Sequence, residues 1–163
     1  MKDTIAICPG SFDPITIGHL DIISRSAKMF SKVIVVVMTN ANKSGGSFTV
    51  EERVEMIKKS VKDIPNVEVD YFGGLLADYA AQKNAKAIIK GLRAVTDFEY
   101  EFQMALTNKK LNPNVETLFL TTSAENMYLS SSMIKQIAAL GGDISDFVPA
   151  VIHNDIVNRL KKG

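Results

Sequence analysis

A run of nine residues near the start of the chain combines groups that suit phosphate binding. The sequence Ser11-Phe-Asp-Pro-Ile-Thr-Ile-Gly-His19 follows the apolar residues 4–8 and leads into residues 18–30, whose apolar side chains recur at helical spacing. A helix start after a tight turn offers unpaired N–H groups and a positive dipole end to an anion. His19 falls in the first helical turn, within reach of such an anion. A purely structural histidine is the alternative, but the neighbouring serine and turn favour the phosphate site.

A second candidate lies where a short apolar strand ends in Lys90-Gly-Leu-Arg93. Cations at the end of a buried strand are costly without an anionic partner, although solvated surface side chains are an alternative. Arg93 can bind phosphate oxygens through a bidentate fork, whereas Lys90 offers a compact charge. Lys43, in the polar loop after residues 33–38, is a third candidate cation.

A third candidate is Leu129-Ser-Ser-Ser-Met-Ile-Lys135, again at a predicted helix start. Three hydroxyls beside unpaired N–H groups form a natural phosphate cradle. Plain N-capping is the alternative, but one serine would suffice for it. We therefore expect Ser130, Ser131 and Ser132 to face the same ligand as the other candidates.

The elements that must position these residues alternate between strands and helices. Thr49, with Glu52, and Thr96 are predicted helix N-caps, and Gly141-Gly142 ends another helix. Strands are predicted at residues 4–8, 33–38, 67–71, 87–89 and 116–120, and helices at 18–30, 49–62, 75–83, 96–110, 130–140 and after Pro149. This order predicts an α/β fold, a doubly wound five-stranded parallel sheet with helices on both faces, in one domain over residues 1–163. The carboxyl ends of the strands then share one edge, where ligands bind.

The composition limits the function classes. Lys plus Arg number 19 against 18 Asp plus Glu, so the chain lacks the basic excess of a general nucleic-acid or anionic-membrane binder. The single cysteine, Cys8, cannot form an internal disulfide and is expected to be a small buried residue. No signal peptide is recognisable and the longest apolar run is too short to cross a bilayer, so we expect a cytoplasmic protein.

The sequence contains no Cys/His spacing for zinc, no Walker-type phosphate loop and no nucleophile–base pair. Hydroxyls, cations and helix starts at one sheet edge suit phosphoryl or nucleotidyl transfer, in which positioning and charge stabilisation provide most of the catalysis.

The motifs resemble those of the bacterial phosphopantetheine adenylyltransferase family. Ser11 to His19 is similar to the nucleotidyltransferase form of the HIGH motif, with Thr16 in the first His position, and Leu129 to Lys135 resembles the second motif of that superfamily. Phe48-Thr-Val-Glu-Glu-Arg53, Lys90-Gly-Leu-Arg-Ala-Val95 and Asp97-Phe-Glu-Tyr-Glu101 match the family in order and spacing. The similarity extends over essentially the whole chain.

The resemblance implies a Rossmann-like nucleotidyltransferase fold and transfer of AMP from ATP to 4′-phosphopantetheine, giving dephospho-CoA and pyrophosphate, the penultimate step of coenzyme A biosynthesis. It also implies Mg²⁺ carried by ATP without protein metal ligands, a homohexamer, and coenzyme A as a feedback ligand. The implied catalytic residues are Ser11, His19, Lys43 and Arg93. The implied ATP-binding residues are Ser11, Phe12, Gly18, His19, Gly91, Leu92, Arg93, Glu101, Asn126, Met127, Tyr128, Leu129, Ser130, Ser131 and Ser132, and those for phosphopantetheine are Ser11, Lys43, Leu76, Lys90, Met104 and Asn108.

Two alternatives stay open from the sequence. One is another adenylyl- or cytidylyltransferase of the same fold, acting on nicotinate mononucleotide or a phosphorylated polyol; the other is a non-catalytic adenine-nucleotide or coenzyme A sensor. The sequence also leaves open whether His19 acts as a neutral donor or as a cation.

Overall fold

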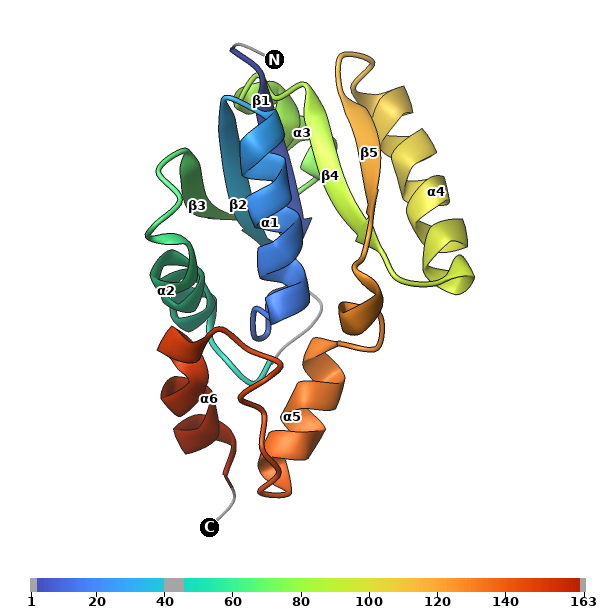
Figure 1. The fold of residues 1–163 in the computed structure, drawn as a ribbon. Coiled ribbons are helices and arrows are strands. Elements are labelled where there is room, and N and C mark those ends of the chain that lie inside the picture. Colours follow the sequence, from blue (N-terminus) through green and yellow to red (C-terminus); the bar gives the residue numbers. More distant parts are fainter. Residues whose placement is uncertain (1–2, 40–45, 162–163) are drawn as a thin grey trace.

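The computed structural model describes residues 3–39 and 46–161, and in these ranges every predicted strand and helix is present (Figure 1). The strands are β1 (Ile5–Gly10), β2 (Lys32–Met38), β3 (Val67–Phe72), β4 (Ala87–Leu92) and β5 (Glu116–Thr121). The helices are α1 (Ile17–Met29), α2 (Val50–Val61), α3 (Leu76–Gln82), α4 (Val95–Leu111), α5 (Ser131–Ala139) and α6 (His153–Leu160), with 3₁₀ turns at η1 (Ala124–Asn126) and η2 (Ala150–Ile152).

The five strands form one parallel sheet in the order β3-β2-β1-β4-β5. The chain builds outward from β1 to β3, crosses back, and continues from β4 to β5 on the other side. The strand order therefore reverses between β1 and β4, which is where ligands bind in sheets of this kind. This arrangement confirms the predicted doubly wound fold.

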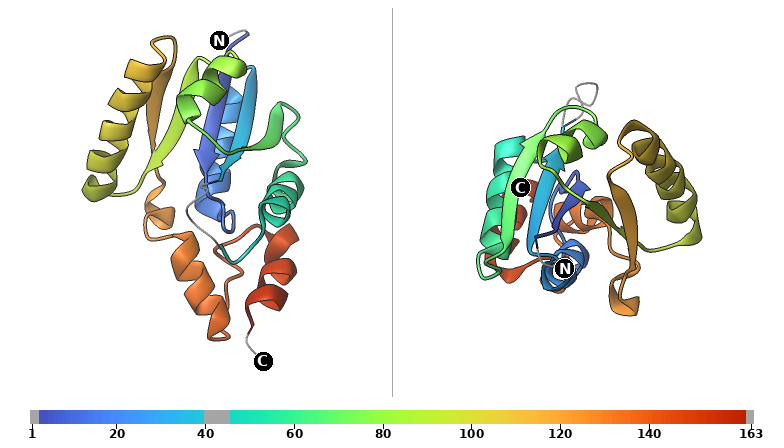
Figure 2. Two further views of the ribbon diagram at one scale, coloured as in Figure 1. Left: turned by 180° about the vertical axis from the view of Figure 1, so that it is seen from behind. Right: turned by 90° about the horizontal axis from the view of Figure 1, so that it is seen from above.

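Alternate side chains of β1, β2 and β4 enter two separate cores, as the twofold period of a strand requires. Cys8 and Ile89 pack on the face covered by α1 and α2, whereas Ile7 and Ile88 pack on the opposite face with Tyr79 of α3. Seen from behind, α3 lies across the sheet face opposite α1 (Figure 2). Helices α5 and α6 lie beyond the carboxyl ends of the strands (Figure 1). Within the described ranges, no helix combines the length and apolar character needed to span a membrane.

The helix ends largely follow the predicted signals. Thr49 and Glu52 form both halves of a capping box at α2, and Gly141, directly after the C-cap of α5, adopts a left-handed conformation (φ 80°). The prediction that Thr96 caps α4 is wrong. The extended backbone of Ala94 (φ −149°, ψ 167°) is the N-cap, so Thr96 lies inside the first helical turn.

Candidate active site

The carboxyl ends of β1 and β4 open into a cleft of about 970 Å³ between α1, α4 and α5. The structure brings most of the predicted ATP-binding residues to this cleft, namely Ser11, Phe12, Gly18, His19, Gly91, Arg93, Glu101, Asn126, Leu129, Ser130, Ser131 and Ser132. Leu92, Met127 and Tyr128 do not line it. Lys43 lies outside the described residues.

The imidazole of His19 is fixed by the N-terminal cap of its own helix. The Thr16 backbone N–H donates to Nδ1 of His19 over 3.0 Å, and the Thr16 hydroxyl accepts the His19 backbone N–H over 3.2 Å. Because Nδ1 accepts a backbone N–H, the ring proton is assigned to Nε2. The ring also packs edge-on against Phe12, with centroids 5.0 Å apart. The described residues offer Nε2 no partner, so its N–H is available to a ligand in the cleft.

The surroundings of His19 favour its neutral form. Burial, followed by the positive charges of Arg93 and Lys90, lowers the pKa of His19 from 6.5 to about 4. The imidazole is therefore a neutral hydrogen-bond donor at pH 7.

This pKa predicts a pH dependence of stability. Unfolded chain binds a proton on His19 below about pH 6.5, whereas the folded protein does not until about pH 4. The folded state therefore loses stability as pH falls through this window. We expect Tm to drop more between pH 7.5 and 5 in the wild type than in His19→Gln, which cannot titrate there. Equal drops, measured by calorimetry, would contradict a lowered pKa.

Two cations at the end of β4 face two carboxylates of α4. Lys90 Nζ lies 3.5 Å from Glu101 Oε2, and Arg93 Nε lies 3.3 Å from Asp97 Oδ2. Arg93 also donates to the Leu129 carbonyl over 2.6 Å. An anionic ligand must therefore share Lys90 and Arg93 with the carboxylates of α4. The sequence analysis assigned no role to Asp97.

The serine run is less of a hydroxyl cradle than predicted. Ser130 is the N-cap of α5 and accepts the Met133 N–H over 3.1 Å, as the capping alternative required. Ser131 donates its hydroxyl to the Pro14 carbonyl over 2.8 Å, so that proton is not available to a phosphate. In the described part of the chain, the hydroxyl of Ser132 and the N–H groups of Ser131 and Ser132 have no protein partner. These three donors remain for an anion.

A smaller cavity of about 110 Å³ adjoins the cleft on the α4 side of β4. It shares Lys90 and Glu101 with the cleft, and Leu76, Met104 and Asn108 also line it. The structure thus gathers the described residues predicted for phosphopantetheine, except Ser11, into a pocket beside those predicted for ATP.

Besides Asp97 and Arg159, sequence reasoning assigned no role to three charged residues that pack together at the cleft. Asp13, Arg53 and Lys135 form an ion cluster, in which Lys135 Nζ and Arg53 Nε lie 3.0 and 3.4 Å from the Asp13 carboxylate. All three stand inside the motifs quoted above, which is the one signal that could have singled them out. Within the described ranges, no three His, Cys, Asp or Glu side chains are grouped as metal ligands.

Comparison with known proteins decides between the nucleotidyltransferase families. Residues 7–137 match the cytidylyltransferase-like family. The phosphopantetheine adenylyltransferase of Caldanaerobacter subterraneus subsp. tengcongensis is 59% identical over 98% of this chain and 99% of its own, and that of Clostridium tetani is 58% identical over 95% and 96%. The chain belongs to the phosphopantetheine adenylyltransferase family.

A more distant solved structure shares the fold of this adenylyltransferase. A bifunctional NMN adenylyltransferase/ADP ribose pyrophosphatase from Francisella tularensis superposes with a TM-score of 0.72 at 16% identity. The match covers 95% of this chain and 49% of that one, so the chain spans about half of that structure.

Proposed function

We propose that this chain transfers the adenylyl group of ATP to 4′-phosphopantetheine, giving dephospho-CoA and pyrophosphate in coenzyme A biosynthesis. The observation that carries this proposal is the pair of adjoining cavities that share Lys90 and Glu101. The larger one offers His19, Arg93 and the start of α5 to the phosphates of ATP. The smaller one, with Leu76 and Met104 in its wall, suits a slender, partly apolar arm ending in a phosphate at Lys90.

The chemistry would be an in-line displacement at the α-phosphorus of ATP. An oxygen of the acceptor phosphate forms a bond to that phosphorus, the bond to the β-phosphate oxygen breaks, and pyrophosphate leaves with the electron pair. The attacking oxygen is already anionic at neutral pH, so no general base is required. His19 would donate a hydrogen bond from Nε2–H, and Arg93 from its guanidinium N–H groups, to phosphate oxygens that gain negative charge in the transition state.

The α4 carboxylates of the cleft are already paired with cations, which suits a metal ion that arrives bound to its substrate. Asp97 and Glu101 are each paired with a cation at the end of β4, so Mg²⁺ would be held mainly by the phosphates of ATP, where it would offset their charge.

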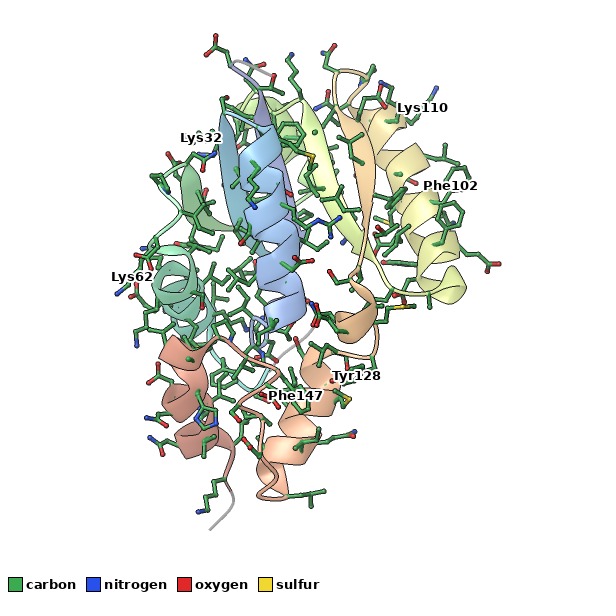
Figure 3. All side chains as sticks on the ribbon, viewed as in Figure 1. Lys32, Lys62, Phe102, Lys110, Tyr128 and Phe147 are labelled. Carbon is green, nitrogen blue, oxygen red and sulfur yellow. The ribbon has the colours of Figure 1, made fainter. Side chains whose placement is uncertain are left out.

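Lys43 and Ser11 are proposed to assist at the transferred phosphate. Phe102 on α4 is exposed (Figure 3), as is Leu106 on the same helix. These apolar side chains support self-association, and we propose a homohexamer. A cytoplasmic location and feedback by coenzyme A complete the proposal.

Lys90 provides a prediction specific to the acceptor. Lys90→Met removes the cation at the junction of the two cavities. A hydrogen bond to a charged group contributes roughly 1.5–3 kcal/mol, so KM for 4′-phosphopantetheine is expected to rise by about tenfold to a hundredfold. KM for ATP should stay within about twofold if Lys90 serves the acceptor alone. Lys86→Met, at an exposed lysine that lines neither cavity, is the matched control, and an equal rise for both substrates would contradict this role.

The proposed function is tested by acceptor choice. Pyrophosphate release from ATP and Mg²⁺ is measured with 4′-phosphopantetheine, with nicotinate mononucleotide, and with no acceptor. The proposal expects release with 4′-phosphopantetheine alone. Release with nicotinate mononucleotide instead would keep the fold and replace the substrate, and no release with either would favour a nucleotide sensor.

A further inference from the structure

Asp13 is a buried carboxylate, and protein groups contact both of its oxygens. Its side chain is 10% exposed. Oδ2 accepts the Ser47 N–H over 3.0 Å and lies 3.0 Å from Lys135 Nζ, while Oδ1 accepts the Phe48 N–H over 3.0 Å and lies 3.4 Å from Arg53 Nε. Two carboxylate oxygens offer about four acceptor positions, and three hydrogen bonds use them here, beside the nearby charge of Arg53, whose Nε–H donates to the Phe48 carbonyl over 2.9 Å. Asp13 therefore has little capacity left for a ligand, although it borders the cleft.

The four partners belong to segments that are far apart in the sequence. Ser47 and Phe48 lead into α2, Arg53 lies on α2, and Lys135 lies on α5. Backbone carbonyls of the same turn after β1 hold these segments as well. Arg53 donates to the Ser11 carbonyl over 3.3 Å, and the Ser131 hydroxyl donates to the Pro14 carbonyl over 2.8 Å. One turn, residues 11–16, thus joins α2 and α5.

Packing over the carboxylate leaves no room for a side chain. A Cβ added at Gly46 would overlap the Arg53 guanidinium and lie 2.5 Å from Asp13 Oδ2. The backbone at Gly46 therefore covers one side of the ion cluster, which strengthens its interactions relative to those in water.

The joined segments carry the anion-facing groups of the cleft. His19 follows the turn at the start of α1, and the Ser131 and Ser132 N–H groups begin α5, one helical turn before Lys135. We propose that Asp13 is a positioning residue for ATP, which acts through Lys135 to hold the start of α5 at a fixed spacing from the turn that leads to His19. This inference rests on the proposed function. Asp13 itself touches no reacting atom in it.

The opposite expectation follows if Lys135 binds a phosphate directly, because Lys135 also lines the cleft. Asp13 would then compete with ATP for this cation, and its removal would tighten ATP binding. The sign of the change in ATP affinity therefore separates positioning from competition.

The test uses Asp13→Asn, Lys135→Met, the double variant and Lys135→Arg in the full chain. We expect each single variant to raise the Kd of ATP, measured by calorimetry without acceptor, by about tenfold and to lower kcat similarly. KM for 4′-phosphopantetheine should stay within about twofold, because the smaller cavity is not joined to this cluster. The double variant should be no worse than the singles, since both break one interaction, and Lys135→Arg should recover most of the loss.

Two outcomes overturn the proposal: Asp13→Asn that binds ATP as well as or better than the wild type, or effects of the single variants that add fully. Lys59→Met, which breaks an exposed pair with Asp155 (2.9 Å) between α2 and α6, is the control for general loss of ion pairs. Should Asp13→Asn unfold at the assay temperature, Ser131→Ala breaks the other hydrogen bond between the turn and α5. Positioning expects this variant to raise the Kd of ATP, whereas competition for Lys135 expects no change. If the wild type transfers no AMP, the proposed function fails, and the ATP titration still tests the positioning role.

Discussion

Replacing His19 by alanine is expected to lower kcat by about 10²- to 10³-fold, with KM for either substrate changed far less. The reason is the fixed orientation of the imidazole. Thr16 holds Nδ1 through its backbone N–H, so Nε2–H is presented to the cleft before any ligand arrives. A donor preorganised in this way stabilises charge that develops only in the transition state. The measurement is steady-state pyrophosphate release with ATP and 4′-phosphopantetheine.

Two further variants make the His19 prediction specific. His19→Gln places a neutral amide donor at similar reach and is expected to retain part of the activity. His153, the second histidine of the chain, lies on α6 and does not line the cleft. His153→Ala is therefore the control and should leave kcat unchanged. A His19→Ala variant with wild-type kcat would remove His19 from the chemistry.

Replacing Arg93 by methionine is the second large expected effect, a loss of about 10²-fold or more in kcat/KM for ATP. Arg93 lines the cleft at the end of β4, where its guanidinium can serve phosphate oxygens while it stays anchored on the Leu129 carbonyl. Arg93→Lys keeps the charge but loses the planar fork, so it is expected to recover only part of the activity.

Arg25 is a closely matched control for Arg93. It donates to the Thr121 carbonyl over 2.8 Å and pairs with Asp21 over 3.2 Å, much as Arg93 pairs with a carbonyl and with Asp97, but it does not line the cleft. Arg25→Met should therefore have little effect on kcat/KM. Equal losses in Arg25→Met and Arg93→Met would mean that the Arg93 effect is structural.

The elements of the fold were readable because each has a strong local signal. Apolar runs such as residues 33–38 predicted buried strands, and the capping box at Thr49 predicted the start of α2. The extension of β4 to Leu92 was missed because Lys90 and Gly91 interrupt the apolar pattern. The strand order, by contrast, depends on which faces pack together, and no local pattern encodes it.

The chemical character of the site was predictable, whereas the hydrogen bonds and ion pairs among its residues were not. Ser131 bonds to Pro14, and Lys135 bonds to Asp13, across more than a hundred residues of sequence. Such contacts form only once the chain has folded, so the sequence does not show them. For this reason the three serines at the start of α5 were expected to offer more free hydroxyls than the structure leaves.

Three of the residues predicted to bind ATP from the family resemblance do not border the cleft. Leu92 is the last residue of β4, and its neighbours Gly91 and Arg93 line the cleft whereas Leu92 does not. Met127 and Tyr128 are exposed in the turn before α5, where Tyr128 packs edge-on against Phe147 with centroids 6.1 Å apart (Figure 3). Their contact with ATP stays a prediction.

The most direct test of the account follows the oxygen atoms of the acceptor. 4′-Phosphopantetheine with its non-bridging phosphate oxygens labelled with ¹⁸O is incubated with ATP, Mg²⁺ and the purified chain, and the product is analysed by mass spectrometry. Attack by the acceptor phosphate on the α-phosphorus predicts a product heavier by one AMP unit that retains all of the label, with one pyrophosphate released per product. A product that has lost one labelled oxygen, or ATP hydrolysis without an adenylylated product, would contradict direct transfer at this site.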